Sequence, residues 1–223
     1  MAVDDATVPL ARERRSNGER SAEMRSTLIE AAIQALCDLG YSRTTTQEIC
    51  RRAGATSGAI QHHFGSKDEL VLATLEKLRS EIEERLESAS LSQGTMEERC
   101  YKVVRELWET FYSRQRYIAV SEIAIGSRGD RAFYERIMVQ RHTTLKTCEV
   151  LWAKTFQLSR PDRTRLDAMH VTLSFLRGLN LYTNDEQDRK TIEAQIKIMS
   201  GALARIMQDP EKNKANKPAR KKS

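Results

Sequence analysis

Apolar residues recur at intervals of three and four along most of this chain, and no stretch alternates apolar and polar residues as a half-buried β-strand does. The runs with helical spacing cover 24–39, 47–53, 57–63, 66–88, 95–113, 117–127, 130–156, 161–182 and 185–207. We therefore predict an all-α fold of about nine helices, because each such run supplies one helix with one buried face.

The most informative segment is 44–70, where a tight turn separates two short helices and a third helix follows. Gly54 suits the positive φ with which helices often end. Thr56 or Ser57 can cap the next helix, and Ser66 can cap the one after it. This layout is typical of a helix-turn-helix that reads DNA, although a short polar helix on the surface of a bundle has the same pattern.

The second short helix is small and polar on one side, as a helix must be to enter the major groove. Glycine and alanine allow close backbone approach, while hydroxyl and amide groups can bond base edges. The candidates for base contacts are Thr56, Ser57, Gly58 and Gln61. The candidates for phosphate contacts are Thr44, Thr45, Thr46, His62, His63 and Lys67. Lys67 lies in the first turn of its helix, where free N–H groups also attract phosphate, unless it is simply a solvated lysine.

Positive charge is concentrated in two places along the 223 residues, whose formal net charge is +6. Residues 211–223 carry +5 and residues 41–67 carry +3. A basic helix-turn-helix suits phosphate binding. The tail either adds non-specific affinity for nucleic acid or only improves solubility. The segment 1–22 lacks helical periodicity and is expected to be an arm that reaches phosphates or a minor groove through Arg12, Arg14, Arg15 and Arg20.

Composition argues against a membrane or secreted protein. No run of about 18 apolar residues exists, and the N-terminus has no apolar core segment, so we expect neither a membrane span nor a secretory signal. A cytoplasmic location follows from this expectation. The 4 cysteines lie outside any CxxC motif, which favours buried thiols over a zinc site, a disulfide framework or a redox switch: Cys37, Cys50, Cys100 and Cys148.

Catalytic and metal motifs are missing from the sequence. The adjacent His62 and His63 point about 100° apart on a helix and have no third ligand nearby, so we expect no metal. There is no nucleophile elbow, phosphate-cradling glycine loop or metal-ligand cluster. We therefore expect no enzyme activity and no cofactor.

A known family shares the pattern of the N-terminal segment. The matching residues are Leu28–Gly40, Tyr41, 44–54, Ser57-Gly58-Ala59-Ile60, His62-His63-Phe64 and Ser66–Leu70. Over about 24–75 the chain resembles the N-terminal domain of tetracycline-repressor-type (TetR) transcription regulators. It departs from the family at Gln61, where a DNA-contacting tyrosine is usual, and at Ala55, where valine is usual. Gln61 could instead read a base.

The resemblance implies a homodimer that binds a palindromic operator on double-stranded DNA, usually as a repressor. It also implies that an unidentified small-molecule effector in the C-terminal domain releases the DNA. An activator or a ligand-independent regulator of the same fold would need the same DNA contacts. A helical adaptor that binds protein is the more distant alternative, and mobility shift on DNA separates it from a regulator.

Composition breaks divide the chain into four parts. We expect a flexible basic arm over 1–22, a helix-turn-helix domain with its connecting helix over 23–88, a ligand-binding and dimerisation domain over 95–208 and a disordered basic tail over 209–223. The boundary at 90–94 is followed by a capping box, Thr95 with Glu98.

Two regular apolar stripes near the C-terminus predict a dimer interface, since the family pairs its last two helices between subunits. They consist of Leu166, Met169, Leu173, Leu176, Ile192, Ile196, Met199, Leu203 and Ile206. The alternative is that both stripes pack within one subunit.

Aromatic and polar residues on three central helices are candidates for a ligand pocket. They are Trp108, Phe111, Tyr112, Glu122, Tyr134, Met138 and His142. Such aromatics can equally be ordinary core residues, and Glu122 and His142 can equally face solvent.

Overall fold

The computed structural model describes residues 16–89, 91–112, 115–158, 163–182 and 189–208. These parts of the chain are helical and hold no strand, which confirms the all-α prediction. The helices are α1 (Asn17–Leu39), α2 (Thr46–Ala53), α3 (Ser57–Phe64), α4 (Lys67–Ser88), α5 (Met96–Leu107), α6 (Gln115–Gly126), α7 (Arg131–Phe156), α8 (Arg163–Tyr182) and α9 (Arg189–Met207). A π-helical turn η1 (Trp108–Tyr112) extends α5, and a 3₁₀ turn η2 (Ser127–Gly129) follows α6.

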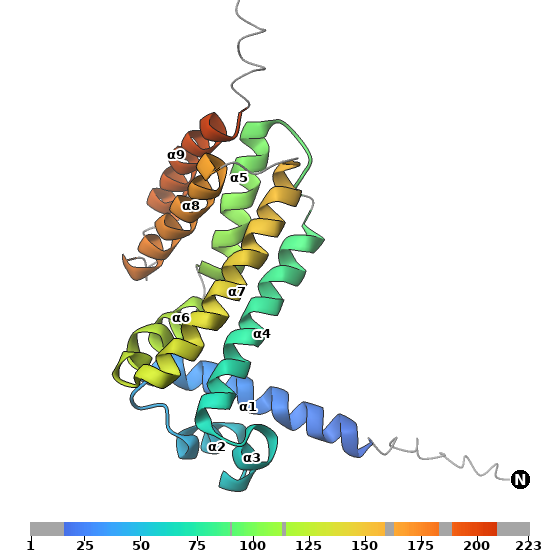
Figure 1. The fold of residues 1–223 in the computed structure, drawn as a ribbon, viewed down its shortest axis with the longest axis vertical. Helices are drawn as coiled ribbons and strands as arrows, with labels where there is room; N and C mark the ends of the chain where they lie inside the picture. Colours follow the sequence, from blue (N-terminus) through green and yellow to red (C-terminus); the bar gives the residue numbers. More distant parts are fainter. Residues whose placement is uncertain (1–15, 90, 113–114, 159–162, 183–188, 209–223) are drawn as a thin grey trace, which may run out of the picture.

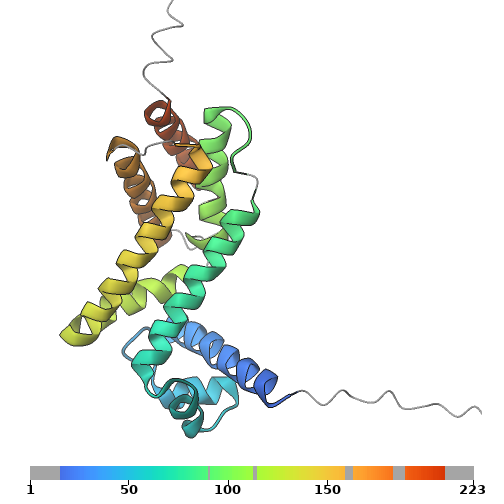
Figure 2. The same ribbon diagram turned by 45° about the vertical axis from the view of Figure 1, so that its right-hand side comes forward.

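The molecule is elongated, with α1, α2 and α3 at one end and α8 and α9 towards the other (Figure 1). The long helices α4 and α7 lie side by side and connect the two ends in both views (Figure 2). Helix α6 lies across α1, and α5 packs against α9. The small three-helix end is therefore attached to the body through α4 and through the contact of α1 with α6.

Helix α1 begins earlier than the apolar pattern indicates. Ser16 caps it through a capping box, since its Oγ accepts a hydrogen bond from the Glu19 N–H (3.1 Å) and its own N–H donates to Glu19 Oε2 (2.7 Å). The prediction of an arm over 1–22 is therefore wrong for residues 17–22, which are helical and exposed. Residues 1–15 and the tail 209–223 lie outside the described residues.

The hydrophobic core at the three-helix end is not built from that end alone. Leu28, Leu36, Ile49, Ile60 and Leu70 come from α1 to α4. The cluster is completed by four buried residues of the body: Ala119 and Ile123 on α6, and Phe133 and Ile137 on α7. The sequence boundary at 90–94 is therefore no boundary of the core, because the second half of α4 packs on the C-terminal cluster while α6 and α7 reach into the N-terminal one.

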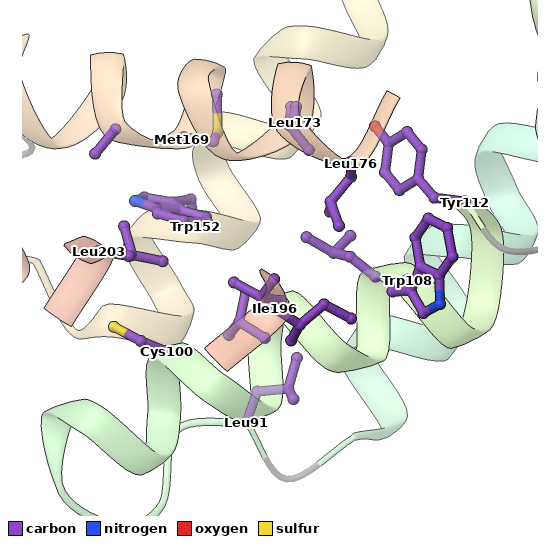
Figure 3. Packing of buried hydrophobic residues seen from close by; sticks show 14 of the residues in the cluster. Leu91, Cys100, Trp108, Tyr112, Trp152, Met169, Leu173, Leu176, Ile196 and Leu203 are labelled. Carbon is purple, nitrogen blue, oxygen red and sulfur yellow. The ribbon is translucent and has the colours of Figure 1, made fainter. Parts of the chain in front are cut away.

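The second core lies between α5, η1, α7, α8 and α9 (Figure 3). Its α8 side chains Met169, Leu173 and Leu176 lie close to Trp152 and Ile196. This burial corrects the interface prediction, because six of its nine residues are buried within the subunit: Met169, Leu173, Leu176, Ile192, Ile196 and Leu203. Leu166 and Met199 are half-buried, and Ile206 alone of the nine is exposed.

The π-helical turn η1 changes which side chains point inward after α5. A π turn holds an extra residue, so the faces of the helix rotate relative to a continued α-helix. Trp108 enters the core at the start of this turn, and Phe111 and Tyr112 follow at its end. The Tyr112 carbonyl accepts a hydrogen bond from the Asn180 side chain on α8, which satisfies a group that the wider turn leaves free.

Candidate DNA-binding surface and internal cavity

The turn between α2 and α3 is fixed by backbone geometry and by one buried thiol. Gly54 has φ of 62°, in the left-handed region, and the Ala55 N–H donates to the Cys50 carbonyl at 2.9 Å. The Cys50 thiol lies beneath the turn and donates to the Thr56 carbonyl at 3.2 Å. Buried Ile60 then anchors α3 in the core, so the opposite side of α3 must face outward.

That outward side of α3 contains every candidate for a base contact. Thr56, Ser57, Gly58 and Gln61 are all exposed, and His62 lies next to them. The Thr56 hydroxyl makes no capping hydrogen bond to α3. A Cβ added at Gly58 would meet only ordinary contact, so the fold itself does not require glycine there.

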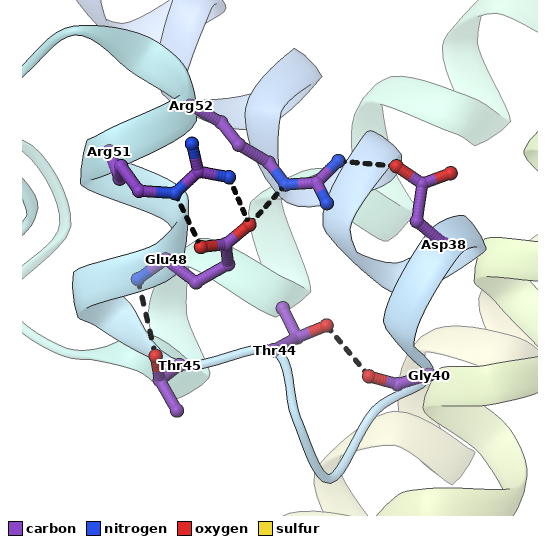
Figure 4. Close-up of polar contacts among 7 residues, drawn as sticks. All are labelled: Asp38, Gly40, Thr44, Thr45, Glu48, Arg51 and Arg52. Atoms are coloured by element: carbon purple, nitrogen blue, oxygen red, sulfur yellow. Dashed lines mark hydrogen bonds and ion pairs between the residues drawn. The ribbon is translucent and has the colours of Figure 1, made fainter.

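The three threonines at the start of α2 have different surroundings, and Figure 4 shows the first two, Thr44 and Thr45. Thr45 is exposed and caps α2 by accepting a hydrogen bond from the Glu48 N–H at 3.2 Å. Thr46 is half-buried. Thr44 is 0% exposed, and its hydroxyl donates to the Gly40 carbonyl at 2.8 Å. The prediction that Thr44 contacts phosphate is wrong, because its hydroxyl instead satisfies the carbonyl at the end of α1.

Acidic side chains neutralise much of the positive charge counted in this segment. Glu48 accepts hydrogen bonds from both Arg51 (2.8 Å) and Arg52 (2.7 Å), and Arg52 also bonds Asp38 (Figure 4). These two guanidinium groups lower the pKa of Glu48 to about 2, so the carboxylate stays charged. The count of +3 over 41–67 already includes Glu48, and Asp38, which lies outside that range, offsets one further positive charge.

Lys67, at the start of α4, is half-buried, and its Nζ lies 4.6 Å from the centre of the Tyr41 ring. Burial lowers the pKa of Lys67. A cation held over an aromatic face has a fixed position. The Lys67 ammonium is therefore suited to contact one phosphate, rather than to attract several phosphates weakly.

Replacing Thr44 by valine tests its structural role. The change keeps the shape of the side chain but leaves the part-buried Gly40 carbonyl without the Thr44 hydroxyl, at a cost of about 1–2 kcal/mol of unfolding free energy. We expect a lower midpoint in urea denaturation and unchanged DNA affinity under native conditions. A variant of wild-type stability that binds DNA more weakly would restore the phosphate assignment.

The loop after α1 is attached to α6. The Tyr41 N–H donates to Glu122 Oε2 at 3.0 Å, and Gly126 lies so close to Tyr41 that a Cβ there would overlap its ring. Glu122 was predicted to line the pocket, and that prediction is wrong, because its carboxylate faces the three-helix end. This contact attaches α6 to the loop that precedes α2.

A cavity of about 380 Å³ lies between α4, η1, α6, α7 and α8. Four predicted residues line it: Phe111, Tyr112, Tyr134 and Met138. The predictions that Trp108 and His142 line the pocket were wrong. Trp108 is buried in the core beside it, and His142 is exposed on α7.

Sequence reasoning missed the charged lining of this cavity. It contains Glu83, Arg79, Arg128, Arg141 and Arg177. Arginines on amphipathic helices usually face solvent, so spacing alone gave no reason to place them at a cavity. Arg79 is bound to both Glu76 and Glu83 on its own helix.

The described residues offer neither a membrane-spanning helix nor a metal-binding cluster. No helix there is long and apolar enough to cross a membrane. No group of three or more histidine, cysteine or acidic residues in the described ranges is arranged to hold a metal ion.

Known proteins match both the N-terminal end and the whole fold. Residues 28–74 match the family described as bacterial regulatory proteins, tetR family. The chain is 28% identical over 184 residues to the HTH-type transcriptional regulator CymR of Pseudomonas putida, covering 81% of this chain and 89% of CymR. It is 41% identical over 83 residues to the HTH-type transcriptional regulator TtgR, also of Pseudomonas putida, covering 37% of this chain and 39% of TtgR.

Among solved structures, a transcriptional regulator from Rhodococcus sp. Rha1 has the same fold, with a TM-score of 0.67 and 19% identity over 81% of this chain and 96% of that one. A helix-turn-helix at the end of a helical body of this architecture makes the chain a DNA-binding transcriptional regulator. Over residues 28–74 it matches the DNA-binding domain of the tetR family of bacterial regulatory proteins, as the resemblance of its N-terminal segment implied.

Proposed function

We propose that this protein is a homodimeric repressor that holds a palindromic operator through two copies of α3 and leaves it when a small molecule fills the cavity. The observation that carries the proposal is the exposed polar face of α3, which no other part of the described chain covers. A DNA-binding regulator acts where the bacterial chromosome lies, so we expect the protein in the cytoplasm.

The base contacts are assigned to Thr56, Ser57, Gly58 and Gln61 and the phosphate contacts to Thr45, Thr46, His62, His63 and Lys67. The first group lies on the outward side of α3, and Thr45 and Lys67 flank it at the starts of α2 and α4. Phosphate contacts on either side of a reading helix fix its register in the groove.

The dimer interface is assigned to the exposed side of α8 and α9. Large apolar residues there face solvent in the single chain: Val171, Leu181, Ile198 and Ile206. Gly178 and Gly201 have open space where a Cβ would stand, so a second pair of helices can approach closely. Paired across a two-fold axis, these sides form a four-helix bundle that holds two copies of α3 at a fixed separation.

Ile198→Glu tests this interface. Ile198 is 74% exposed in the single chain. In a two-fold dimer the change buries a charge twice, which costs about 3 kcal/mol or more for each unpaired charge. We expect a monomer at micromolar concentration by sedimentation velocity, with weakened operator binding. The matched control is Val139→Glu on α7, a helix outside the proposed interface, where the residue is 70% exposed. Equal loss of the dimer in both variants would contradict the assignment.

Gly58→Ala separates folding from DNA binding. Gly58 lies within α3 and has room for a methyl group, so alanine should leave stability unchanged or raise it by up to about 1 kcal/mol. The added methyl points to the side proposed to enter the groove, and operator affinity should fall at least tenfold. Thermal unfolding and fluorescence anisotropy on the same preparation measure both quantities. Full affinity in the alanine variant would place α3 outside the groove.

Lys67→Ala and Gln61→Ala distinguish the two kinds of contact. Loss of one phosphate contact per head should weaken binding to all duplexes alike and reduce the slope of log K against log salt by about 1 per contact. Loss of Gln61 should alter sequence preference at one position of each half-site instead. Binding titrations at several salt concentrations, on the operator and on single-base variants, separate these effects. An unchanged salt slope in Lys67→Ala would show that Lys67 contacts no phosphate.

The function as a whole is tested by selection of duplexes from a random pool with the purified full chain, followed by mobility shift. We expect a palindromic consensus whose half-sites are spaced by about one helical turn or a multiple of it. Footprinting of the genomic copy shows whether it overlaps a promoter, as repression requires. Failure to retain any duplex at low ionic strength refutes the proposal.

A further inference from the structure

Arg177 is a guanidinium at the cavity wall with no carboxylate partner among the described residues. It lies on α8, is half-buried and lines the cavity. Its charge acts on two other groups of the wall, the Tyr112 hydroxyl and the Cys148 thiol. Neither of these carries a compensating negative charge, because burial raises the pKa of both Tyr112 and Cys148.

The other charged residues of the cavity do not compensate the positive charge of Arg177. Glu83 is the acidic residue in the lining, and it is bound by Arg79. Arg79 also binds Glu76, so Glu76, Arg79 and Glu83 pair with one another along α4. Arg128 and Arg141 are exposed at the edge of the cavity and add positive charge. A positive charge in a poorly solvated space is costly unless an anion accompanies it.

Three aromatic rings share the cavity wall with Arg177. Phe111, Tyr112 and Tyr117 contact one another, with ring centroids 5.1 Å apart for Phe111 and Tyr112, 5.5 Å for Phe111 and Tyr117 and 4.8 Å for Tyr112 and Tyr117. All three line the cavity. Such a wall favours the edge or face of a planar ring. Leucines, isoleucines and Met138 supply most of the remaining surface.

We propose that the effector is a small aromatic carboxylate, with its ring against Phe111 and Tyr117 and its carboxylate accepting hydrogen bonds from Arg177 and the Tyr112 hydroxyl. Guanidinium binds carboxylate through paired N–H donors, which fixes the orientation of the ring as well as the charge. A cavity of about 380 Å³ is at the small end of ligand sites, which suits one or two fused or linked rings. This inference rests on the proposed role of the cavity as the effector site.

The test is calorimetric titration of the full chain, without DNA, with benzoate, 2-naphthoate and biphenyl-4-carboxylate. Each acid is compared with its neutral carboxamide, and 2-naphthoate also with the cationic 2-naphthylmethylamine. We expect at least one carboxylate to bind, and to bind at least tenfold more tightly than its carboxamide. Absence of binding by all three carboxylates at millimolar concentration overturns the proposal, as does equal or tighter binding of the amide or amine.

Variants test whether Arg177 causes the preference for a carboxylate over its carboxamide. Arg177→Gln should remove the advantage of the carboxylate while leaving carboxamide binding within about twofold, and Arg177→Lys should restore part of it because a cation remains. Arg141→Gln is the matched control, an arginine at the cavity edge, and should keep the advantage. Retention of the advantage in a folded Arg177→Gln protein, checked by thermal unfolding, overturns the assignment.

DNA binding in the absence of compound distinguishes this inference from the proposed function. Arg177→Gln should shift the selected duplex as the unaltered chain does, and 2-naphthoate should release the duplex from the unaltered chain only. Carboxylate binding by a protein that retains no duplex would refute the regulator. Duplex binding without carboxylate selectivity would refute the ligand class alone.

Discussion

The DNA-binding end of this protein does not close its own hydrophobic core, and the remaining architecture follows from that constraint. A three-helix unit of this size buries a smaller fraction of its surface than a larger domain does and is only marginally stable by itself. Ala119 and Ile123 of α6, with Phe133 and Ile137 of α7, supply the missing side chains. The position of α3 is therefore set by the body as well as by α1 and α2, and the two parts cannot move independently without opening this core.

The two sides of helix α6 pack against different parts of the molecule. Val120 and Ala124 line the cavity, while Ala119 and Ile123 fill the core beneath the DNA-binding end. Glu122 on the same helix holds the Tyr41 N–H at 3.0 Å. A molecule that occupies the cavity therefore presses on a helix whose other side positions α1 and the loop before α2. Close packing turns a small shift of such a helix into a change between alternative arrangements rather than a gradual deformation.

The sequence predicted the helix-turn-helix closely and the body only in outline. Caps, Gly54 and the buried Ile60 are local signals, and local signals specify a small unit almost completely. An apolar stripe on α8 or α9 identifies a buried face but not the partner that buries it, so the stripe through Leu173 and Ile196 was assigned to a second subunit although it packs within one. The π turn at Trp108 changes the register of a helix without any recognisable motif, and Thr44 reads as a surface hydroxyl until the carbonyl that it satisfies is located.

Because charges near α3 are paired, the affinity of the DNA-binding end depends on the proposed dimer interface, the exposed side of α8 and α9. Arg51 and Arg52 are engaged by Glu48, so Lys67, held over Tyr41, is one of few cations near α3 with which one head can displace counterions from phosphate. A single head must then rely on hydrogen bonds in the groove, which select a sequence but add limited affinity. Joining two heads makes the second contact intramolecular and multiplies their affinities. A weakly charged head therefore gains most from pairing with a second head, as in the proposed dimer, where sequence specificity and dimerisation would depend on each other.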